Sequence, residues 1–112
     1  MKIGIITAMS KEREQIVQLL EENKEIKCGK FTYIVGSLNG NELVIMASGI
    51  GKVNTAIGTV EMIKTHQPDC IVSTGVAGGI DPEVSVMDVV VAKSVVYHDV
   101  YYIILHRRIK IF

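Results

Sequence analysis

Residues 2–12 read KIGIITAMSKE, and this stretch decides the fold. Its first part, residues 2–8, is a short apolar run rich in isoleucine, which is typical of a buried β-strand. Ser10 can cap a helix that follows at once, and we expect this helix to fade near Asn23. The apolar residues at helical spacing are Ile16, Leu19 and Leu20. A buried strand that leads directly into a helix indicates an α/β protein.

The next part of the chain predicts a β-hairpin. Residues 31–38 and 42–47 are two runs rich in β-forming residues, and Asn39-Gly40 separates them. An Asn-Gly pair between apolar strands is the strongest short-range signal of a hairpin, because both residues tolerate a positive φ.

A second helix follows this hairpin and ends at Pro68. The apolar residues with helical spacing are Val53, Ala56, Ile57, Val60 and Ile63. Residues 70–74 then predict another buried strand, and residues 84–98 predict a last strand centred on 89–92. Because the buried strands lack in/out alternation, we expect an α/β protein with a mostly parallel or mixed central sheet.

Composition excludes several classes of protein. The chain has 112 residues, 48% of them hydrophobic, and equal numbers of basic and acidic side chains. It therefore reads as one ordered domain with no general affinity for nucleic acid. It has no apolar run long enough for a membrane span and no signal-peptide cleavage site, so we expect a cytoplasmic protein. Cys28 and Cys70 are too isolated for a metal site, and we expect two reduced, partly buried thiols.

The neutral total hides a difference along the chain. Residues 1–99 carry a net charge of −3, whereas residues 100–112 carry +3 and contain no acid. Four of the six aromatic residues also lie in the last 16 positions. We therefore expect residues 100–112 to be a different kind of sequence from the body of the chain. A nucleic-acid or membrane role for this tail is a weak alternative, because three cations support only salt-sensitive binding.

Ligand sites in α/β sheets form outside the carboxyl ends of the strands. Three segments reach such ends here: residues 7–10, residues 48–51 and the glycine-rich residues 75–79. The glycine segment at residues 49–54 matches neither the dinucleotide fingerprint nor the P-loop. The residues at 75–79 either allow a ligand close to the backbone or only make a tight turn. The histidines are not spaced as a metal set, and His98 is either a structural histidine with its hydrogen bonds satisfied, the favoured interpretation, or, with Asp99, a polar contact near a site.

Glu12 is the most informative single residue. At about 100 degrees per residue it lies in line with the apolar side of the first helix, whereas Glu14 points to the opposite side. An inward carboxylate beside a strand end can act as a general base. The alternative is an ordinary first-turn acid that complements the helix dipole. Partial burial would raise its pKa, and the helix N-terminus would lower it.

Four segments together resemble a known family. MKIGIITAMSKE, SGIGKVNTA, PDCIVSTGVAGGI and VVVAKSVVYHD are similar to the N-terminal half of the 5′-methylthioadenosine/S-adenosylhomocysteine nucleosidases, members of the purine nucleoside phosphorylase superfamily. The resemblance covers residues 1 to about 100. It implies a phosphorylase/hydrolase-like fold with three α/β/α layers and a mixed central sheet, here truncated.

The resemblance also implies an activity. Family members hydrolyse the N-glycosidic bond of methylthioadenosine and adenosylhomocysteine, which releases adenine and a thioribose in methionine salvage. They are homodimers that use no metal or organic cofactor. Glu12 matches the general base that activates water, and Met9 and Ile50 match residues of the alkylthio pocket. Val76, Ala77 and Gly78 match the loop beneath the ribose and purine.

Three positions set this chain apart within the superfamily. Phosphorylases carry an arginine just before the glycine turn to hold phosphate, but this chain has Ser73 at that position, followed by Thr74. Because phosphate recognition favours a charged donor fork, water is the expected nucleophile. Val76 replaces a serine common in the family, and Met87 replaces a glycine.

Residues 1–99 are therefore predicted to be the N-terminal half of a nucleosidase-like domain, and residues 100–112 a tail outside the family. A frameshifted or prematurely ended gene is the favoured origin of this tail. The acid that protonates the purine belongs to the family's second half, so we expect the 112-residue chain to be inactive or impaired. Two alternatives are a self-associating α/β module without catalysis and a phosphate-dependent phosphorylase.

Overall fold

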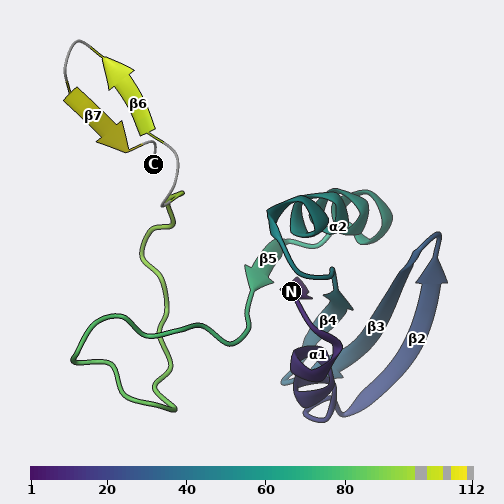
Figure 1. Ribbon diagram of the computed structural model, residues 1–112. Helices are drawn as coiled ribbons and strands as arrows, with labels where there is room; N and C mark the ends of the chain where they lie inside the picture. Colours follow the sequence, from purple (N-terminus) through teal and green to yellow (C-terminus); the bar gives the residue numbers. More distant parts are fainter. Residues whose placement is uncertain (98–100, 105–106, 111–112) are drawn as a thin grey trace. The chain divides into compact units, whose positions relative to one another are not determined.

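The computed structural model describes residues 1–97, 101–104 and 107–110 (Figure 1). The chain divides into two units, Met1–Ala77 and Gly78–Phe112. The predicted boundary at residue 99, which separates the family-like sequence from the tail at 100–112, stays a prediction. In the described part of the chain, no helix has the length and apolar character that crossing a membrane requires.

The first unit is a five-stranded sheet with two helices. Its elements are β1 (Lys2–Thr7), α1 (Ser10–Val17), β2 (Glu22–Cys28), β3 (Phe31–Leu38), β4 (Asn41–Ala47), α2 (Lys52–His66) and β5 (Cys70–Ser73). The strand order is β2-β3-β4-β1-β5. β1 runs parallel to β4 and β5, whereas β3 runs antiparallel to β2 and β4, so the sheet is mixed as predicted.

The hairpin between β3 and β4 forms where the sequence predicts it. Leu38 pairs with Asn41, which leaves Asn39 and Gly40 as a two-residue turn. Both turn residues have positive φ, 50° and 74°, as a type I′ turn requires. This turn fixes the register in which β3 pairs with β4.

The two helices cover opposite faces of the sheet. Side chains alternate between faces along a strand, so Ile6 and its neighbour Met46 share one face. Met62 of α2 packs with both on that face. On the other face, a Cβ added to Gly36 would lie 2.7 Å from Leu20 Cδ1, just beyond α1. The three α/β/α layers are therefore confirmed.

The main core lies between α2 and the sheet. Its five fully buried members are Ile6, Tyr33, Val44, Met46 and Met62. Small residues bring α2 close to the strands, since a Cβ added to Gly58 would stand 2.8 Å from Met46 Cε. Burying a large aliphatic side chain stabilises the fold by about 1.5–3 kcal/mol, so this cluster holds α2 on the sheet.

Three details of the first helix and its surroundings differ from the prediction. The N-cap of α1 is Met9, not Ser10, and the helix ends at Val17, well before Asn23. The chain leaves the helix because Leu20 packs against Gly36 and the Glu21 amide donates to the Ser37 carbonyl at 3.0 Å. The pairing then continues as β2, a strand the sequence analysis did not predict.

The predicted strand at 84–98 is wrong for its described part. Residues 84–97 contain turns and irregular chain, and Val86, Val89 and Val91 are largely exposed. A run of valines forms a buried strand only beside other strands, and no described strand pairs with this one. The strands of the second unit are instead β6 (Tyr101–Ile104) and β7 (Arg107–Lys110), which pair antiparallel. His98 and Asp99 lie outside the described residues.

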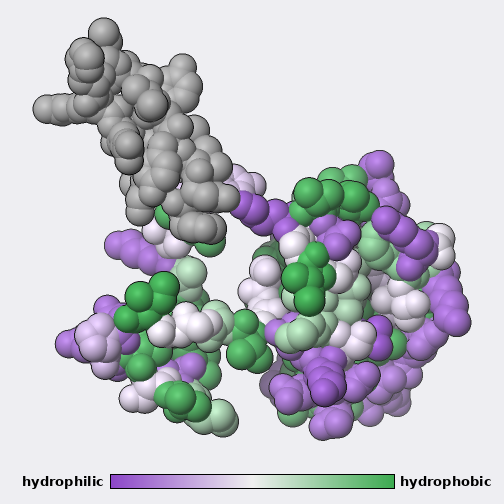
Figure 2. Space-filling model, viewed as in Figure 1, coloured by the Kyte–Doolittle hydropathy of each residue, from purple (hydrophilic) through white to green (hydrophobic). Residues whose placement is uncertain are grey.

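Two further surface features follow from the sheet order. Cys28 ends β2 and Cys70 begins β5, the two edge strands, and both thiols are free and exposed rather than partly buried. On α2 the apolar residues whose spacing predicted the helix face outward, while Gly58 and Met62 face the sheet. Figure 2 shows hydrophobic residues gathered over α2. We call Val53, Ile57, Val60 and Ile63 the outer stripe of α2.

The core account predicts a large contrast between adjacent residues of α2. Met62→Ala removes a fully buried side chain, so it should lower the free energy of unfolding by about 2–5 kcal/mol. Ile63→Ala, whose side chain is half exposed, should cost about 0.5 kcal/mol. Urea denaturation followed by circular dichroism measures both. Equal costs would contradict the assignment of the buried face.

His66, at the end of α2, predicts a pH dependence of stability. Its ring lies edge-on to Tyr33, with ring centroids 4.4 Å apart. Burial lowers the pKa of His66, the Lys2 cation lowers it further, and Glu42 opposes both. The unfolded chain therefore binds the proton first, near pH 6.5, and stability should fall as the pH drops from 7 to 5. His66→Gln should flatten this part of the stability profile; an unchanged slope would contradict the account.

Candidate active site

The carboxyl ends of β1, β4 and β5 meet at one edge of the sheet. These strands are parallel and end at Thr7, Ala47 and Ser73. Hydrogen bonding continues past their ends, because the Ser48 amide donates to the Thr7 carbonyl at 2.9 Å and the Thr74 amide donates to the Ile6 carbonyl at 3.0 Å. The segments that follow the three strands therefore start side by side, as the sequence predicts. We call this edge the strand-end site.

Glu12 lies at this edge and points inward. It occupies the first turn of α1 and is buried, whereas Glu14 is exposed. Its Oε2 accepts a hydrogen bond from the Met9 amide at 2.9 Å, and its Oε1 accepts one from the Val76 amide, also at 2.9 Å. Among the residues whose burial the structure describes, Glu12 is the only buried acid. The carboxylate thus joins the start of α1 to the loop after β5.

These two contacts separate the two interpretations of Glu12. The hydrogen bond from the Met9 amide is the usual capping contact of an acid in the first turn of a helix. The bond to Val76 reaches a residue 64 positions away on another element, which helix capping does not require. Glu12 therefore caps α1 and also occupies the strand-end site.

The surroundings of Glu12 favour its ionised form. The Val76 amide lowers the pKa of Glu12 most, the Met9 amide lowers it next, burial raises it, and the Ala8 backbone lowers it slightly. Hydrogen bonds to the charged form thus outweigh desolvation. A carboxylate has about four lone-pair positions, so the hydrogen bonds from Val76 and Met9 do not use its whole capacity as an acceptor.

Three of the other predicted residues lie at the same edge. Met9 is the N-cap of α1, Ile50 lies in the turn before α2, and Val76 follows β5. All three side chains are exposed, Ile50 and Val76 by 74% and 84%. Ala77 ends the first unit, whereas Gly78 begins the second. The pocket roles of all five residues remain predictions.

Hydroxyl groups support the turns at this edge, and the sequence analysis did not single them out. Thr7 is buried and donates through Oγ1 to the Met9 carbonyl at 3.1 Å, which fixes the turn into α1. Ser48 Oγ donates a hydrogen bond to the Gly49 carbonyl at 3.0 Å and lies 3.3 Å from Thr55 Oγ1. The available signal was a polar residue that ends each apolar strand.

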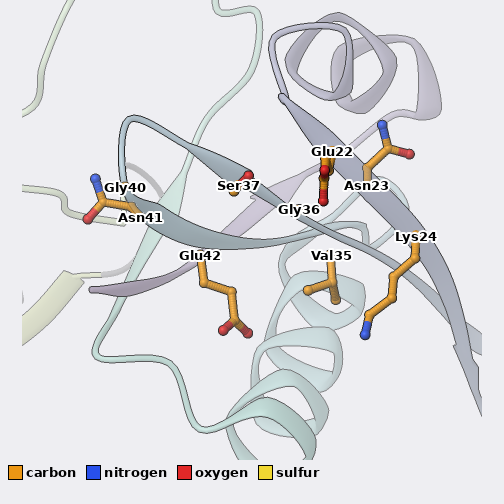
Figure 3. A pocket seen from close by; sticks show the side chains of 9 residues that line it. All are labelled: Glu22, Asn23, Lys24, Val35, Gly36, Ser37, Gly40, Asn41 and Glu42. Carbon is orange, nitrogen blue, oxygen red and sulfur yellow. The ribbon is translucent and has the colours of Figure 1, made fainter.

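A separate hollow lies at the other end of β4. It has a volume of about 600 Å³ and is lined by Glu22, Asn23, Lys24, Val35, Gly36, Ser37, Gly40, Asn41 and Glu42 (Figure 3). Most of its lining residues are polar or glycine, and Val35 is its one sizeable apolar side chain. None of the predicted site residues belongs to it. The hollow is therefore not the strand-end site.

The described residues offer no ready metal site. Within the ranges that the structure covers, no group of three or more His, Cys, Asp or Glu side chains is arranged to hold a metal ion. Glu12 has both oxygens engaged by backbone amides instead.

A mixed sheet whose parallel strands end beside a buried carboxylate defines an α/β protein with a candidate site at the strand ends. The sequence profile of the Phosphorylase superfamily matches residues 2–102, and the chain belongs to this superfamily. Its relatives include the 5′-methylthioadenosine/S-adenosylhomocysteine nucleosidase of Desulfotalea psychrophila, which is 46% identical over 99 residues. That match covers 88% of this chain and 42% of the relative.

Solved structures agree with this assignment. The nucleosidase of Colwellia psychrerythraea in complex with adenine matches with a TM-score of 0.84 and 43% identity, over 89% of this chain and 41% of that one. The S. pneumoniae nucleosidase with the transition-state inhibitor MT-ImmA matches with a TM-score of 0.85 and 40% identity, over 89% and 44%. The chain thus spans about two-fifths of the length of the relatives it matches.

The hydrogen bonds of Glu12 predict a pH-dependent contribution to stability. The pKa of Glu12 is lowered on folding, so its contribution is complete above the unfolded value of about 4.3 and is lost as the pH falls through the folded value. Glu12→Gln should therefore destabilise the chain at pH 7 and much less at pH 3. Glu14→Gln, the exposed matched control, should have little effect at either pH. A pH-independent cost of Glu12→Gln, measured by urea denaturation, would contradict this account.

Proposed function

We propose that this chain carries the water-activating part of a nucleosidase that cleaves 5′-methylthioadenosine and S-adenosylhomocysteine. The observation that carries the proposal is the Glu12 carboxylate held at the strand ends by the Val76 amide, a hydrogen bond that lowers the pKa of Glu12. The named relatives and the bound adenine and inhibitor of the solved structures support the substrate class.

In the proposed reaction, Glu12 accepts a proton from water as the water oxygen bonds to the anomeric carbon of the ribose. The bond from that carbon to the adenine nitrogen breaks, and the electron pair leaves with adenine. The transition state has the character of an oxocarbenium ion, so a nearby carboxylate also stabilises its positive charge. The low pKa keeps Glu12 charged at neutral pH but makes it a weaker base, and burial partly offsets this.

The leaving adenine also needs a proton, and Glu12 supplies only the other end of the reaction. Glu12 is the only buried acid among the residues whose burial the structure describes, so none of the other described acids is assigned this role. Because the chain spans about two-fifths of its relatives, we propose the complete activity for a site that includes more than the described residues. We expect the 112-residue chain alone to turn over substrate poorly, if at all.

The side chains around Glu12 fit the proposed substrate. Met9 and Ile50 are exposed apolar groups at the strand-end site and would contact the alkylthio group. Val76, Ala77 and Gly78 would lie beneath the ribose and purine. Ser73 stands where a phosphate-binding arginine would be needed, which favours water over phosphate as the nucleophile. The proposal includes no cofactor.

The proposal also covers partners and location. The outer stripe of α2 is an exposed apolar surface of the kind that mediates association, and we assign it to a homodimer. The two free thiols suit a reducing compartment, which supports a cytoplasmic enzyme of methionine salvage. Neither nucleic acid nor a membrane is a proposed partner.

A chimera tests the catalytic proposal. Residues 1–99 of this chain would replace the matching part of the Desulfotalea psychrophila relative, which completes the site. The chimera should release adenine from methylthioadenosine without added phosphate. Glu12→Gln should lower kcat by about 10²–10⁴-fold, the usual contribution of a general base, while Glu14→Gln leaves kcat unchanged. Adenine release is followed by ultraviolet absorbance.

The outcomes separate the alternatives. A requirement for phosphate would favour a phosphorylase, and an active Glu12→Gln chimera would contradict the role of Glu12. The unmodified 112-residue chain is examined in parallel by isothermal titration with a methylthioadenosine transition-state analogue and by mass measurement. A defined oligomer that binds no adenine nucleoside would favour the self-associating module, for which the outer stripe of α2 is the supporting observation.

A further inference from the structure

The loop after β5 passes so close to Glu12 that position 75 has no room for a side chain. A Cβ built on Gly75 would stand 2.8 Å from Glu12 Oε1, 3.1 Å from Cδ and 3.3 Å from Oε2. All three of its nearest atoms thus belong to one carboxyl group. Carbon and oxygen atoms that are not bonded do not pack at 2.8 Å, so any residue other than glycine must displace this carboxylate.

The backbone conformation does not explain the glycine. The glycines with positive φ are Gly29, Gly40, Gly49 and Gly51, and Gly75 is not among them. An alanine at position 75 would therefore meet none of the strain that a positive φ causes. What the position requires is the empty space beside Glu12.

The carboxylate cannot move away without losing contacts. Its Oε1 accepts the Val76 amide and its Oε2 accepts the Met9 amide, both at 2.9 Å. These donors lie on the two segments that the carboxylate joins. A Cβ at position 75 would displace the carboxylate and lengthen its hydrogen bond to the Val76 amide first, because Oε1 is the atom nearest the added Cβ.

We propose that Gly75 is a positioning residue, whose missing side chain provides the space that holds the Glu12 carboxylate against the Val76 amide. The catalytic consequence rests on the function proposed above, in which Glu12 activates water. The geometric consequence does not, since it concerns only where the carboxylate lies. Gly75 touches no substrate in this proposal and acts through Glu12.

Gly75→Ala tests the proposal in the full 112-residue chain. The obstructing atoms are the end of a flexible side chain, so the variant should fold, with an unchanged circular dichroism spectrum. The titration midpoint of the Glu12 carboxyl, followed by NMR, should move upward toward the ordinary glutamate value of about 4.3. The Val76 amide proton should lose the downfield shift that a hydrogen bond to a carboxylate produces.

Gly78→Ala is the matched control for these spectra. A Cβ on Gly78 meets nothing within 4 Å, and its φ is not positive, so this variant should leave the Glu12 midpoint and the Val76 amide unchanged. The Glu14 carboxyl signal should be the same in all the proteins. A Gly75→Ala chain with an unaltered Glu12 midpoint and Val76 amide would overturn the proposal.

A double-mutant cycle keeps the test decisive if Gly75→Ala unfolds the chain. Glu12→Ala removes every atom that the new Cβ would meet first. Gly75→Ala should therefore be much less destabilising in the Glu12→Ala background than in the natural sequence. Equal losses of stability in both backgrounds would contradict the proposal.

These readouts remain informative whatever the chimera does. A displaced carboxylate in a protein without nucleosidase activity would leave the role of Gly75 intact and remove the proposed function. An active chimera, together with a Gly75→Ala chain whose Glu12 carboxylate is unmoved, would support the proposed function and remove the role of Gly75.

Discussion

The Glu12 carboxylate accepts hydrogen bonds from the Met9 amide at the start of α1 and from the Val76 amide after β5. Both donors are neutral backbone groups, so the contact stabilises the negative charge without placing a cation in the site. Hydrogen bonds to a charged group are stronger than those between neutral groups. The strand-end site depends on this interaction, because it orients the one buried acid among the described residues. It also holds the loop after β5 beside the start of α1.

The sheet provides the geometry in which that interaction forms. β1 lies between β4 and β5, and all three run parallel, so their carboxyl ends deliver three loops to one edge. α2 is held to one face of the sheet through Met62, with glycine at position 58 where the helix passes closest to Met46. The same placement turns the outer stripe of α2 to solvent. High hydrophobicity in this short chain thus reflects uncovered apolar surface as well as a core.

The sequence predicted the parts of the fold that depend on local chemistry. Asn39-Gly40 predicted the hairpin because a type I′ turn needs two positive φ angles, and the helical phase of Glu12 predicted its inward orientation. The resemblance correctly implied the superfamily. β2 escaped prediction because an edge strand such as ENKEIKC is mostly exposed and carries no apolar pattern.

Other features depend on contacts that a sequence does not show. The end of α1 is set by Leu20 against Gly36 and by the pairing of Glu21 with Ser37, which are both long-range contacts. The valines at 84–97 have the composition of a strand but no described neighbour to pair with. At the site, the bond from Val76 to Glu12 spans 64 positions, so helical phase alone could not reveal which group the carboxylate meets.

The most direct measurement is the NMR scalar coupling across the hydrogen bond between the Val76 amide nitrogen and the Glu12 carboxyl carbon. At neutral pH the account predicts a detectable coupling, together with slow exchange of the Val76 amide hydrogen. It also predicts that both are lost when Glu12 is protonated. A Val76 amide that shows no coupling and exchanges as fast as an unstructured peptide would contradict the claim that this carboxylate organises the strand-end site.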